Sequence, residues 1–349
     1  MKPLPARTFF HGRRASHRAM LNLIHGLLVA AAAAGLAACG AGGTAAAPPE
    51  AGRHWSLRDG DRVVLLGDTF VEREGDQGHI ETALVAASPQ ATLSFRNLGW
   101  SGDTVWAESR GVFDTPAEGY ARMLGLVREL KPTVLFVAYG RNESFRGPSG
   151  LPAFQAQLAK LCDDVRTAAA GDTGSPVRLV LVTPHRFEKT SQSPDAPARN
   201  EALAPFAAAI RSVAAEKQAG LVDLFAEMPA DSATPLTENG SHLSAAGYAA
   251  AARLFVAASG GQQQRLEPES AEHLRQQVVA KNRLFFHRWR PANETYLFLF
   301  RKYEQGNNAV EIPQFDPLVE EAERTIQATA RQTSQPTPPT PTTPAAGPT

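Results

Sequence analysis

Four short segments of this sequence gather hydroxyl, amide and imidazole side chains beside glycines. They are Gly-Asp-Thr-Phe at 67–70, Asn-Leu-Gly-Trp-Ser-Gly-Asp-Thr at 97–104, Tyr-Gly-Arg-Asn-Glu at 139–143 and Glu-Asn-Gly-Ser-His-Leu at 238–243. Acyl transfer needs a hydroxyl that attacks a carbonyl, an imidazole that takes its proton, and N–H groups that hold the developing oxyanion. Each segment alone is a weak signal, because Gly, Asp and Asn also build ordinary turns. Their order along the chain is the stronger observation.

The first three segments each follow a short apolar run, and the fourth precedes a helical stretch. Such runs predict strands at 62–66, 92–98, 133–138, 177–182 and 220–222, with helices at 77–87, 120–130, 151–169, 200–217 and 244–258. Alternating strands and helices favour an α/β fold, a doubly wound parallel sheet in three layers. In such folds ligands bind beyond the carboxyl ends of the strands, where these polar segments are expected to lie.

The order and spacing of the four segments resemble the SGNH (GDSL-type) hydrolase family over roughly residues 61–260. The resemblance implies a position for each catalytic group. Thr69 stands where the family has its nucleophilic Ser, and its backbone N–H is one oxyanion donor. Gly102 and Asn142 match the two further donors of the oxyanion hole. His242 matches the general base, and Asn239 stands where the family has the triad Asp.

Two of these positions depart from the family pattern. The extra methyl of Thr69 stiffens the side chain and crowds the attacked carbonyl. Asn239 can hold the His242 ring but supplies no negative charge, and the matching Asp-to-Asn change in a serine protease costs about 10⁴ in rate. Glu238, or a backbone carbonyl, are alternative partners for the ring. The sequence thus predicts an intact oxyanion hole beside a weakened proton-transfer half.

Other polar residues near these segments have two interpretations. Asp68 and Asp103 are expected to cap helices or bind loop amides rather than to react. Glu72 and Arg73 either form a local ion pair, which we favour, or point into the cleft. His185 follows the fourth predicted strand and either lines the cleft or lies in a solvated loop.

The character of the chain changes after residue 262. We predict a domain at 61–262, a helical and aromatic-basic appendage at 263–330, and a disordered Pro/Thr-rich tail at 331–349. The appendage contains Arg288 and Arg290. It is either a strap packed on the flank of the domain or a roof over the cleft.

The N-terminus has the pattern of an export signal. The first 38 residues contain five basic residues, no acidic residue and an Ala/Leu-rich stretch, which predicts a signal peptide at 1–38. Leu-Ala-Ala-Cys-Gly at 36–40 resembles a bacterial lipobox, so we expect acylated Cys39 to anchor the protein to a membrane through a flexible tether at 39–60. Gly40 favours the outer membrane by resemblance to lipoprotein sorting. An ordinary cleaved signal, or an uncleaved Ala-rich helix, is the alternative.

Charge and cysteine content exclude several function classes. Beyond residue 38 the chain has 30 basic and 35 acidic residues, which argues against a nucleic-acid partner. Cys162, the only other cysteine, has no partner for a disulfide and is expected to be an inert core thiol. With no clustered His or Cys we predict no metal and no cofactor.

The leading hypothesis is therefore an exported ester hydrolase that acts at the cell surface or in the periplasm on small-molecule, glycan or lipid esters such as O-acetylated glycans. One alternative is a pseudoenzyme whose pocket binds a saccharide or acyl ligand without turnover, favoured by Thr69 and Asn239. Another is a structural surface lipoprotein whose appendage docks a partner.

Overall fold

The computed structural model describes residues 55–170, 176–229 and 232–333. The expected signal peptide, the lipidation site at Cys39 and nearly all of the predicted tail lie outside these ranges. None of the helices within them is both long and apolar enough to cross a membrane.

The described residues form one parallel sheet of five strands in the order β2-β1-β3-β4-β5. The strands are β1 (Arg62–Gly67), β2 (Ser94–Gly99), β3 (Val134–Ala138), β4 (Arg178–Val182) and β5 (Gly220–Val222). β1 and β3 are almost wholly buried, as expected for apolar strands covered on both faces. Strand order reverses direction next to β1, so a crevice for ligands is expected beyond its carboxyl end.

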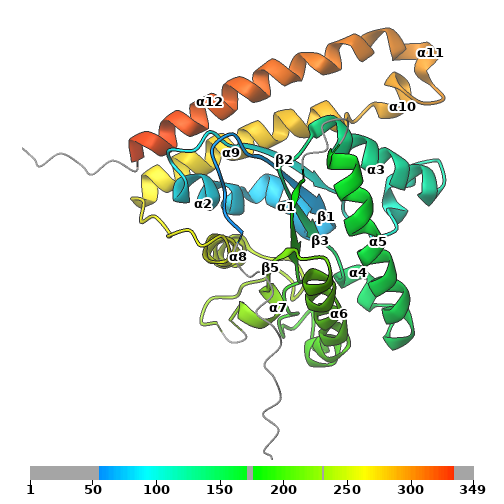
Figure 1. The fold of residues 1–349 in the computed structure, drawn as a ribbon, viewed down its shortest axis with the longest axis vertical. Coiled ribbons are helices and arrows are strands. Elements are labelled where there is room, and N and C mark those ends of the chain that lie inside the picture. The colour runs from blue at the N-terminus through cyan, green and yellow to red at the C-terminus, as the bar shows by residue number, and fades with distance from the viewer. Residues whose placement is uncertain (1–54, 171–175, 230–231, 334–349) are drawn as a thin grey trace, which may run out of the picture. The chain divides into compact units, whose positions relative to one another are not determined.

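Helices cover both faces of the sheet (Figure 1) and confirm the predicted three-layer α/β fold. One face packs against α2 (His79–Ala87), α8 (Ala245–Ala258) and α9 (Pro268–Trp289); the other packs against α3 (Pro116–Leu130), α5 (Leu151–Ala170) and α6 (Ala196–Glu216). The shorter elements are α1 (Thr69–Gln77), α4 (Arg141–Ser144), α7 (Leu224–Glu227), α10 (Glu294–Leu297), α11 (Lys302–Gln305), and the 3₁₀ segments at Glu108–Gly111, Pro148–Gly150 and Gly306–Gln314.

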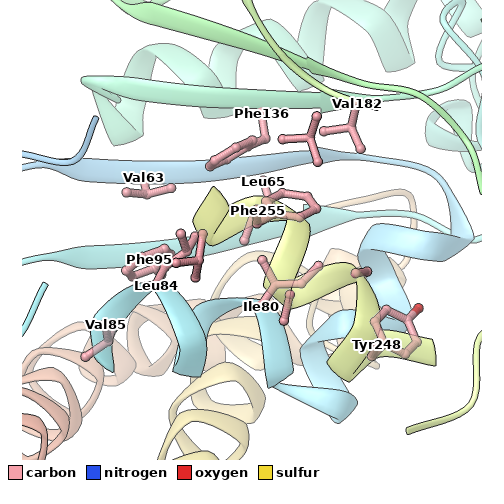
Figure 2. Packing of buried hydrophobic residues seen from close by; sticks show 14 of the residues in the cluster. Val63, Leu65, Ile80, Leu84, Val85, Phe95, Phe136, Val182, Tyr248 and Phe255 are labelled. Carbon is pink, nitrogen blue, oxygen red and sulfur yellow. The ribbon is translucent and has the colours of Figure 1, made fainter. Parts of the chain in front are cut away.

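The core under α2 and α8 is apolar and closely packed. Leu65 and Phe136 of the sheet face Ile80 of α2 and Phe255 of α8, as Figure 2 shows, and all four are nearly inaccessible to solvent. Cys162 is buried in the core on the opposite face, and burial raises the pKa of its thiol to about 12. This rigid centre fixes the loops at the carboxyl edge of the sheet.

The C-terminal part packs on the flank of the sheet. Its last helix, α12 (Phe315–Thr333), lies alongside α9 (Figure 1). Lys281 of α9 is fully buried, 2.9 Å from the Glu81 carboxylate and 3.0 Å from the carbonyl O of Phe95. The Glu323 carboxylate accepts the N–H of Phe95 at 2.9 Å. Because β2 is an edge strand, these bonds occupy backbone groups that would otherwise be open to pairing.

Candidate active site

Thr69 lies at a tight turn between β1 and α1, of which it is the first residue. The Asp68 carboxylate caps this helix by accepting the N–H of Phe70 at 3.0 Å. At Gly67 a Cβ would come within 2.5 Å of both the carbonyl O of Ala138 and Cγ2 of Val71. The sequence Gly-Asp-Thr therefore permits a close turn that presents the Thr69 hydroxyl at the carboxyl edge of the sheet.

Gly102 provides the backbone donor nearest to this hydroxyl. Its N–H donates to Thr69 Oγ1 at 3.0 Å, and its φ of +75° is a left-handed conformation that suits glycine. The preceding residue, Ser101, donates its N–H and its hydroxyl to the Glu72 carboxylate at 2.9 and 2.7 Å. The loop after β2 is thus attached to α1 at two successive residues.

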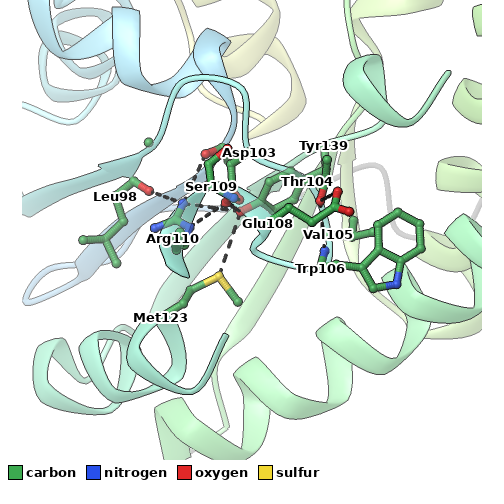
Figure 3. Close-up of polar contacts among 12 residues, drawn as sticks. Leu98, Asp103, Thr104, Val105, Trp106, Glu108, Ser109, Arg110, Met123 and Tyr139 are labelled. Atoms are coloured by element: carbon green, nitrogen blue, oxygen red, sulfur yellow. Dashed lines mark hydrogen bonds and ion pairs between the residues drawn. The ribbon is translucent and has the colours of Figure 1, made fainter. Parts of the chain in front are cut away.

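A buried ion pair holds the base of the same loop (Figure 3). Arg110 Nε lies 2.5 Å from Asp103 Oδ2, and both side chains are almost fully buried. Tyr139 donates its hydroxyl to the same carboxylate oxygen at 2.9 Å. Arg110 Nη2 also donates to the carbonyl O of Leu98 at 2.8 Å. This cluster ties the ends of β2 and β3 to the loop that carries Gly102.

Asn142 is the side-chain donor of the site and lies in α4, directly after β3. Its Nδ2 donates to the carbonyl O of Asp103 at 2.7 Å, which leaves its second N–H available. The neighbouring Glu143 is buried and accepts the N–H groups of Val105 and Gly140, each at 2.8 Å. Burial raises the pKa of Glu143 to about 7. Both side chains join the loop after β2 to the loop after β3.

His242 is oriented by the Asn239 side chain. Asn239 Oδ1 accepts the backbone N–H groups of Ser241 and His242 at 3.1 and 2.9 Å, which fixes the orientation of the amide. Its Nδ2 then faces His242 Nδ1 at 3.2 Å. Because an amide nitrogen only donates, Nδ1 must accept, and in the neutral ring the proton sits on Nε2. This is the opposite of the tautomer that a general base requires.

Thr69, Asn142, His185 and His242 line one cavity of about 160 Å³. No hydrogen bond joins Thr69 to His242 in the described structure. Burial, followed by the positive charges of Arg73 and Arg141, lowers the pKa of His242. The imidazole is therefore held neutral beside the hydroxyl.

The sequence matches the GDSL-like Lipase/Acylhydrolase family over residues 65–250, which is more than half of the chain. The chain belongs to this family. The match covers the segments that carry Thr69, Gly102, Asn142, Asn239 and His242, and it ends before the C-terminal helices.

Solved structures with the family's fold resemble this chain at low sequence identity. A gut microbial diltiazem-metabolizing enzyme is 13% identical, with a TM-score of 0.58 over 82% of this chain and 98% of the other. An acetylxylan esterase from Geobacillus stearothermophilus is 19% identical, with a TM-score of 0.46 over 60% and 99%. A lipase/acylhydrolase from Enterococcus faecalis is 18% identical, with a TM-score of 0.42 over 59% and 99%. No curated protein matches the chain significantly.

Arg141 is a residue of this family member's cavity that the sequence analysis did not single out. It is buried, lines the cavity, and donates from Nη2 to the carbonyl O of His185. His185 itself lies in the cavity wall with Nε2 2.8 Å from the carbonyl O of Ser241. The signal for Arg141 was its place between Gly140 and Asn142, directly after a buried strand.

The remaining predicted residues lie around the cavity, except Arg73, which lines it. The expected ion pair between Glu72 and Arg73 does not form, because Glu72 pairs with Arg290 at 2.7 Å and Arg73 with Glu238 at 2.6 Å. Glu238 therefore does not replace Asn239 behind the ring. Arg288 points elsewhere and pairs with Glu129 and Asp316 at 2.9 and 2.8 Å.

Neither Arg288 nor Arg290 lines the cavity. Asp68 does not line it either; its carboxyl is buried, and burial raises its pKa to about 6. Across residues 55–170, 176–229 and 232–333 no group of three or more His, Cys, Asp or Glu side chains is placed to hold a metal ion.

Proposed function

We propose that this chain is an exported, lipid-anchored ester hydrolase in which Thr69 attacks the ester carbonyl and His242 transfers the proton. The observation that carries the proposal is the 3.0 Å contact between the Gly102 N–H and Thr69 Oγ1, at a cavity that His242 also lines. Membership of an acylhydrolase family supports the same reaction class.

The proposed reaction has two acyl-transfer steps. Thr69 Oγ1 bonds to the carbonyl carbon while its proton passes to His242 Nε2, and the carbonyl oxygen becomes an oxyanion. The N–H groups of Gly102 and Asn142 bind that oxyanion; one such donor is worth roughly 3–4 kcal/mol in a working hydrolase. The carbon–oxygen bond to the alcohol then breaks, and the alcohol leaves with the proton from His242. Water hydrolyses the acyl-Thr69 ester by the same route.

The Asn239 amide opposes the first proton transfer. His242 Nε2 can accept a proton only if the ring proton moves to Nδ1, where it would face the Asn239 N–H groups 3.2 Å away. A slow enzyme is therefore expected. The same contact favours the second candidate function, a pocket that binds an acyl or saccharide ligand without turnover.

For substrate and location we propose acylated glycans or lipids at the cell surface, reached from an anchor at Cys39. A cavity of about 160 Å³ has the volume of roughly five waters, which suits a small acyl group. Cys39→Ser should release the protein from membrane fractions in detergent-free buffer. A mutant that still sediments with membranes would contradict the lipid anchor.

The decisive experiment measures hydrolysis of p-nitrophenyl acetate by the full chain. Thr69→Ala and His242→Ala should each reduce the rate to the uncatalysed level. Thr167→Ala, at an exposed position of α5, and His79→Ala, on α2, are matched controls that should retain wild-type rates. If wild type is no faster than Thr69→Ala, the hydrolase proposal fails and the binding-pocket function takes its place.

A further inference from the structure

Arg141 is a buried cation without a close carboxylate partner. Its side chain is only 7% exposed, and its guanidinium lies over the ring of Phe187 at 4.3 Å. Nη2 donates to the carbonyl O of His185, whereas Nη1 is buried without a hydrogen-bond partner in the described structure. A buried charge ordinarily needs such partners, and Arg141 lines the cavity, so a ligand there would supply the partner that Nη1 lacks.

The charge around the cavity is one-sided. Arg73 and Arg141 both line it, and no Asp or Glu is among the lining residues described. Arg73 is neutralised by Glu238 at 2.6 Å. The only carboxyl that acts on Arg141 at longer range is Asp68, and burial raises the pKa of Asp68 to about 6. At neutral pH a carboxyl with this pKa is mostly ionised and offsets part of the Arg141 charge, but it forms no ion pair with the guanidinium within the described residues, so Arg141 is the cavity cation without a paired carboxylate.

We propose that Arg141 binds a carboxylate of the ligand, so that the ester acted on at this site carries an acidic group. This assignment of substrate class rests on the proposed function. A guanidinium with a free N–H edge, held in place by an aromatic ring and a carbonyl, is a strong carboxylate-binding group. The ligand carboxylate is expected to lie on the Arg141 side of the cavity, because the neighbouring His185 ring has no N–H left to donate to it. The neighbouring His185 ring donates from Nε2 to Ser241 O and presents an acceptor at Nδ1.

Calorimetric titration of the full chain with succinate, succinamide and inorganic phosphate tests this site. Succinate should bind wild type and Arg141→Gln should weaken it at least tenfold, while succinamide should not bind. Arg146→Gln is a matched control, because Arg146 lies outside the cavity and pairs with Glu108 at 2.7 Å. Equal binding of succinate and succinamide, unchanged binding by Arg141→Gln, or binding of phosphate alone would overturn the assignment.

If Arg141→Gln fails to fold, the comparison of succinate with succinamide on wild type still tests whether the cavity binds a carboxylate. Binding needs no turnover, so a failed esterase assay and a failed titration are separate results. The first removes the proposed reaction and the second removes the carboxylate subsite.

A different set of contacts supports a second inference, on the C-terminal end of α9. Arg290 Nη1 lies 2.7 Å from Glu72 Oε2, and its guanidinium stacks on Trp100 at 3.7 Å. The same Glu72 oxygen accepts the N–H of Ser101 at 2.9 Å, and Glu72 Oε1 accepts the Ser101 hydroxyl at 2.7 Å. Ser101 precedes Gly102, whose N–H contacts Thr69 Oγ1. An unbroken series of contacts thus runs from α9 to the oxyanion donor.

We infer that Arg290 is a positioning residue for the oxyanion loop, acting through Glu72 on Ser101 and Gly102. Without Arg290 the Glu72 carboxylate loses its cationic partner, and Trp100 loses the group stacked on its face. The Gly102 N–H then samples orientations in which it no longer points at the reacting carbonyl. The family match ends at residue 250, so this contribution comes from a segment outside it.

Arg288 offers a matched control on the same helix turn, because its ion pairs are to Glu129 and Asp316 and not to the loop. Arg290→Ala should speed hydrogen exchange at the Gly102 amide at least tenfold and lower kcat with little change in KM. Arg290→Lys should restore part of the amide protection at Gly102 and part of kcat. Arg288→Ala should leave both unchanged.

Equal exchange at Gly102 in the two alanine variants would overturn the inference, because a merely structural role would not single out this amide. The exchange measurement does not depend on turnover. It therefore stands whether or not the chain hydrolyses esters.

Discussion

The two halves of the site are held in different ways. The loop that carries Gly102 is anchored by buried charged and polar side chains, with Asp103 paired to Arg110 and bonded to Tyr139. The loop that carries His242 is held by backbone bonds, by the Asn239 amide and by an ion pair at its partly exposed surface. The proposed oxyanion half is therefore held by buried partners. In the proton-transfer half His242 lines the cavity, but the group behind its ring is the Asn239 amide and not a carboxylate.

That difference bears on whether the site is organised for ligand binding or for turnover. A rigid set of N–H donors stabilises a bound carbonyl or oxyanion whether or not a proton moves. An imidazole with its proton on Nε2 donates to such a ligand rather than activating a hydroxyl. The present geometry favours binding over rapid turnover, and changes to each half should affect different measurements.

The largest effect is expected from Asn239→Asp. A carboxylate behind the ring would accept a hydrogen bond from Nδ1–H, leave Nε2 free to act as a base and stabilise the imidazolium. Hydrolysis of p-nitrophenyl acetate should rise by up to about 10⁴-fold, and Thr69→Ser should add to this by removing the crowding methyl.

A double variant that remains inactive would show that Thr69 and His242 are not brought together in solution. Proton transfer would then fail because the two side chains lie too far apart, and not because of the residue types at these positions.

Breaking the buried pair of the other half should cost stability instead. Arg110→Ala leaves Asp103 buried without its cation, which costs about 3–5 kcal/mol of unfolding free energy. Arg324→Ala is the control, since its pair with Glu321 is about two-thirds exposed and is worth about 1 kcal/mol or less. Urea unfolding measures both. Similar losses in the two variants would contradict the buried anchoring assigned to the oxyanion half.

The oxyanion half should also respond to pH. Burial raises the folded-state pKa of Asp68 to about 6 and of Glu143 to about 7. Between their unfolded values near 4 and these folded values the native state binds more protons, so stability falls as pH rises from about 4 to 7.

Asp68→Asn should flatten this fall by about 2–3 kcal/mol, at about 1.4 kcal/mol per pKa unit. Asp114→Asn, at an exposed side chain, should not. Melting temperatures at pH 4 and pH 7.5 provide the measurement. An equal change in melting temperature between these two pH values in wild type and Asp68→Asn would contradict the assigned burial of the Asp68 carboxyl.

The sheet and its flanking helices could be predicted from the sequence because their signals are local. The apolar runs before Gly67 and Tyr139 are β1 and β3, and the fold class they imply is confirmed. Helix α1 was missed, because its nine residues are mostly polar and include an internal glycine, and its start is set by the Asp68 cap.

Side-chain partners were harder to predict than elements, because they depend on contacts between distant residues. The pairing of Glu72 with Arg290, 218 residues later, replaced the expected pair with Arg73. The cavity position of Arg141 could not be told from an exposed helix start, since only the packing of Phe187 and His185 buries it. The residues placed by motif order, Thr69, Asn142 and His242, do line one cavity. Their catalytic roles stay predictions.

The smallest effect concerns the charges that flank His242. Arg73 and Glu238 form a partly exposed pair 2.6 Å apart, and they shift the pKa of His242 in opposite directions: Arg73 lowers it and Glu238 raises it. Arg73→Ala should therefore raise the His242 pKa and Glu238→Gln should lower it, each by less than about one unit because solvent screens exposed charges. The shifts can be followed by NMR titration of the His242 ring.

The double variant should titrate close to wild type, since the two charges cancel, and unfolding free energy should change by about 1 kcal/mol or less in all three. If the single variants shift the pKa in the same direction, His242 responds to a change in loop conformation and not to charge. The proton-transfer half would then be mobile as well as misaligned, and Asn239→Asp alone would not restore it.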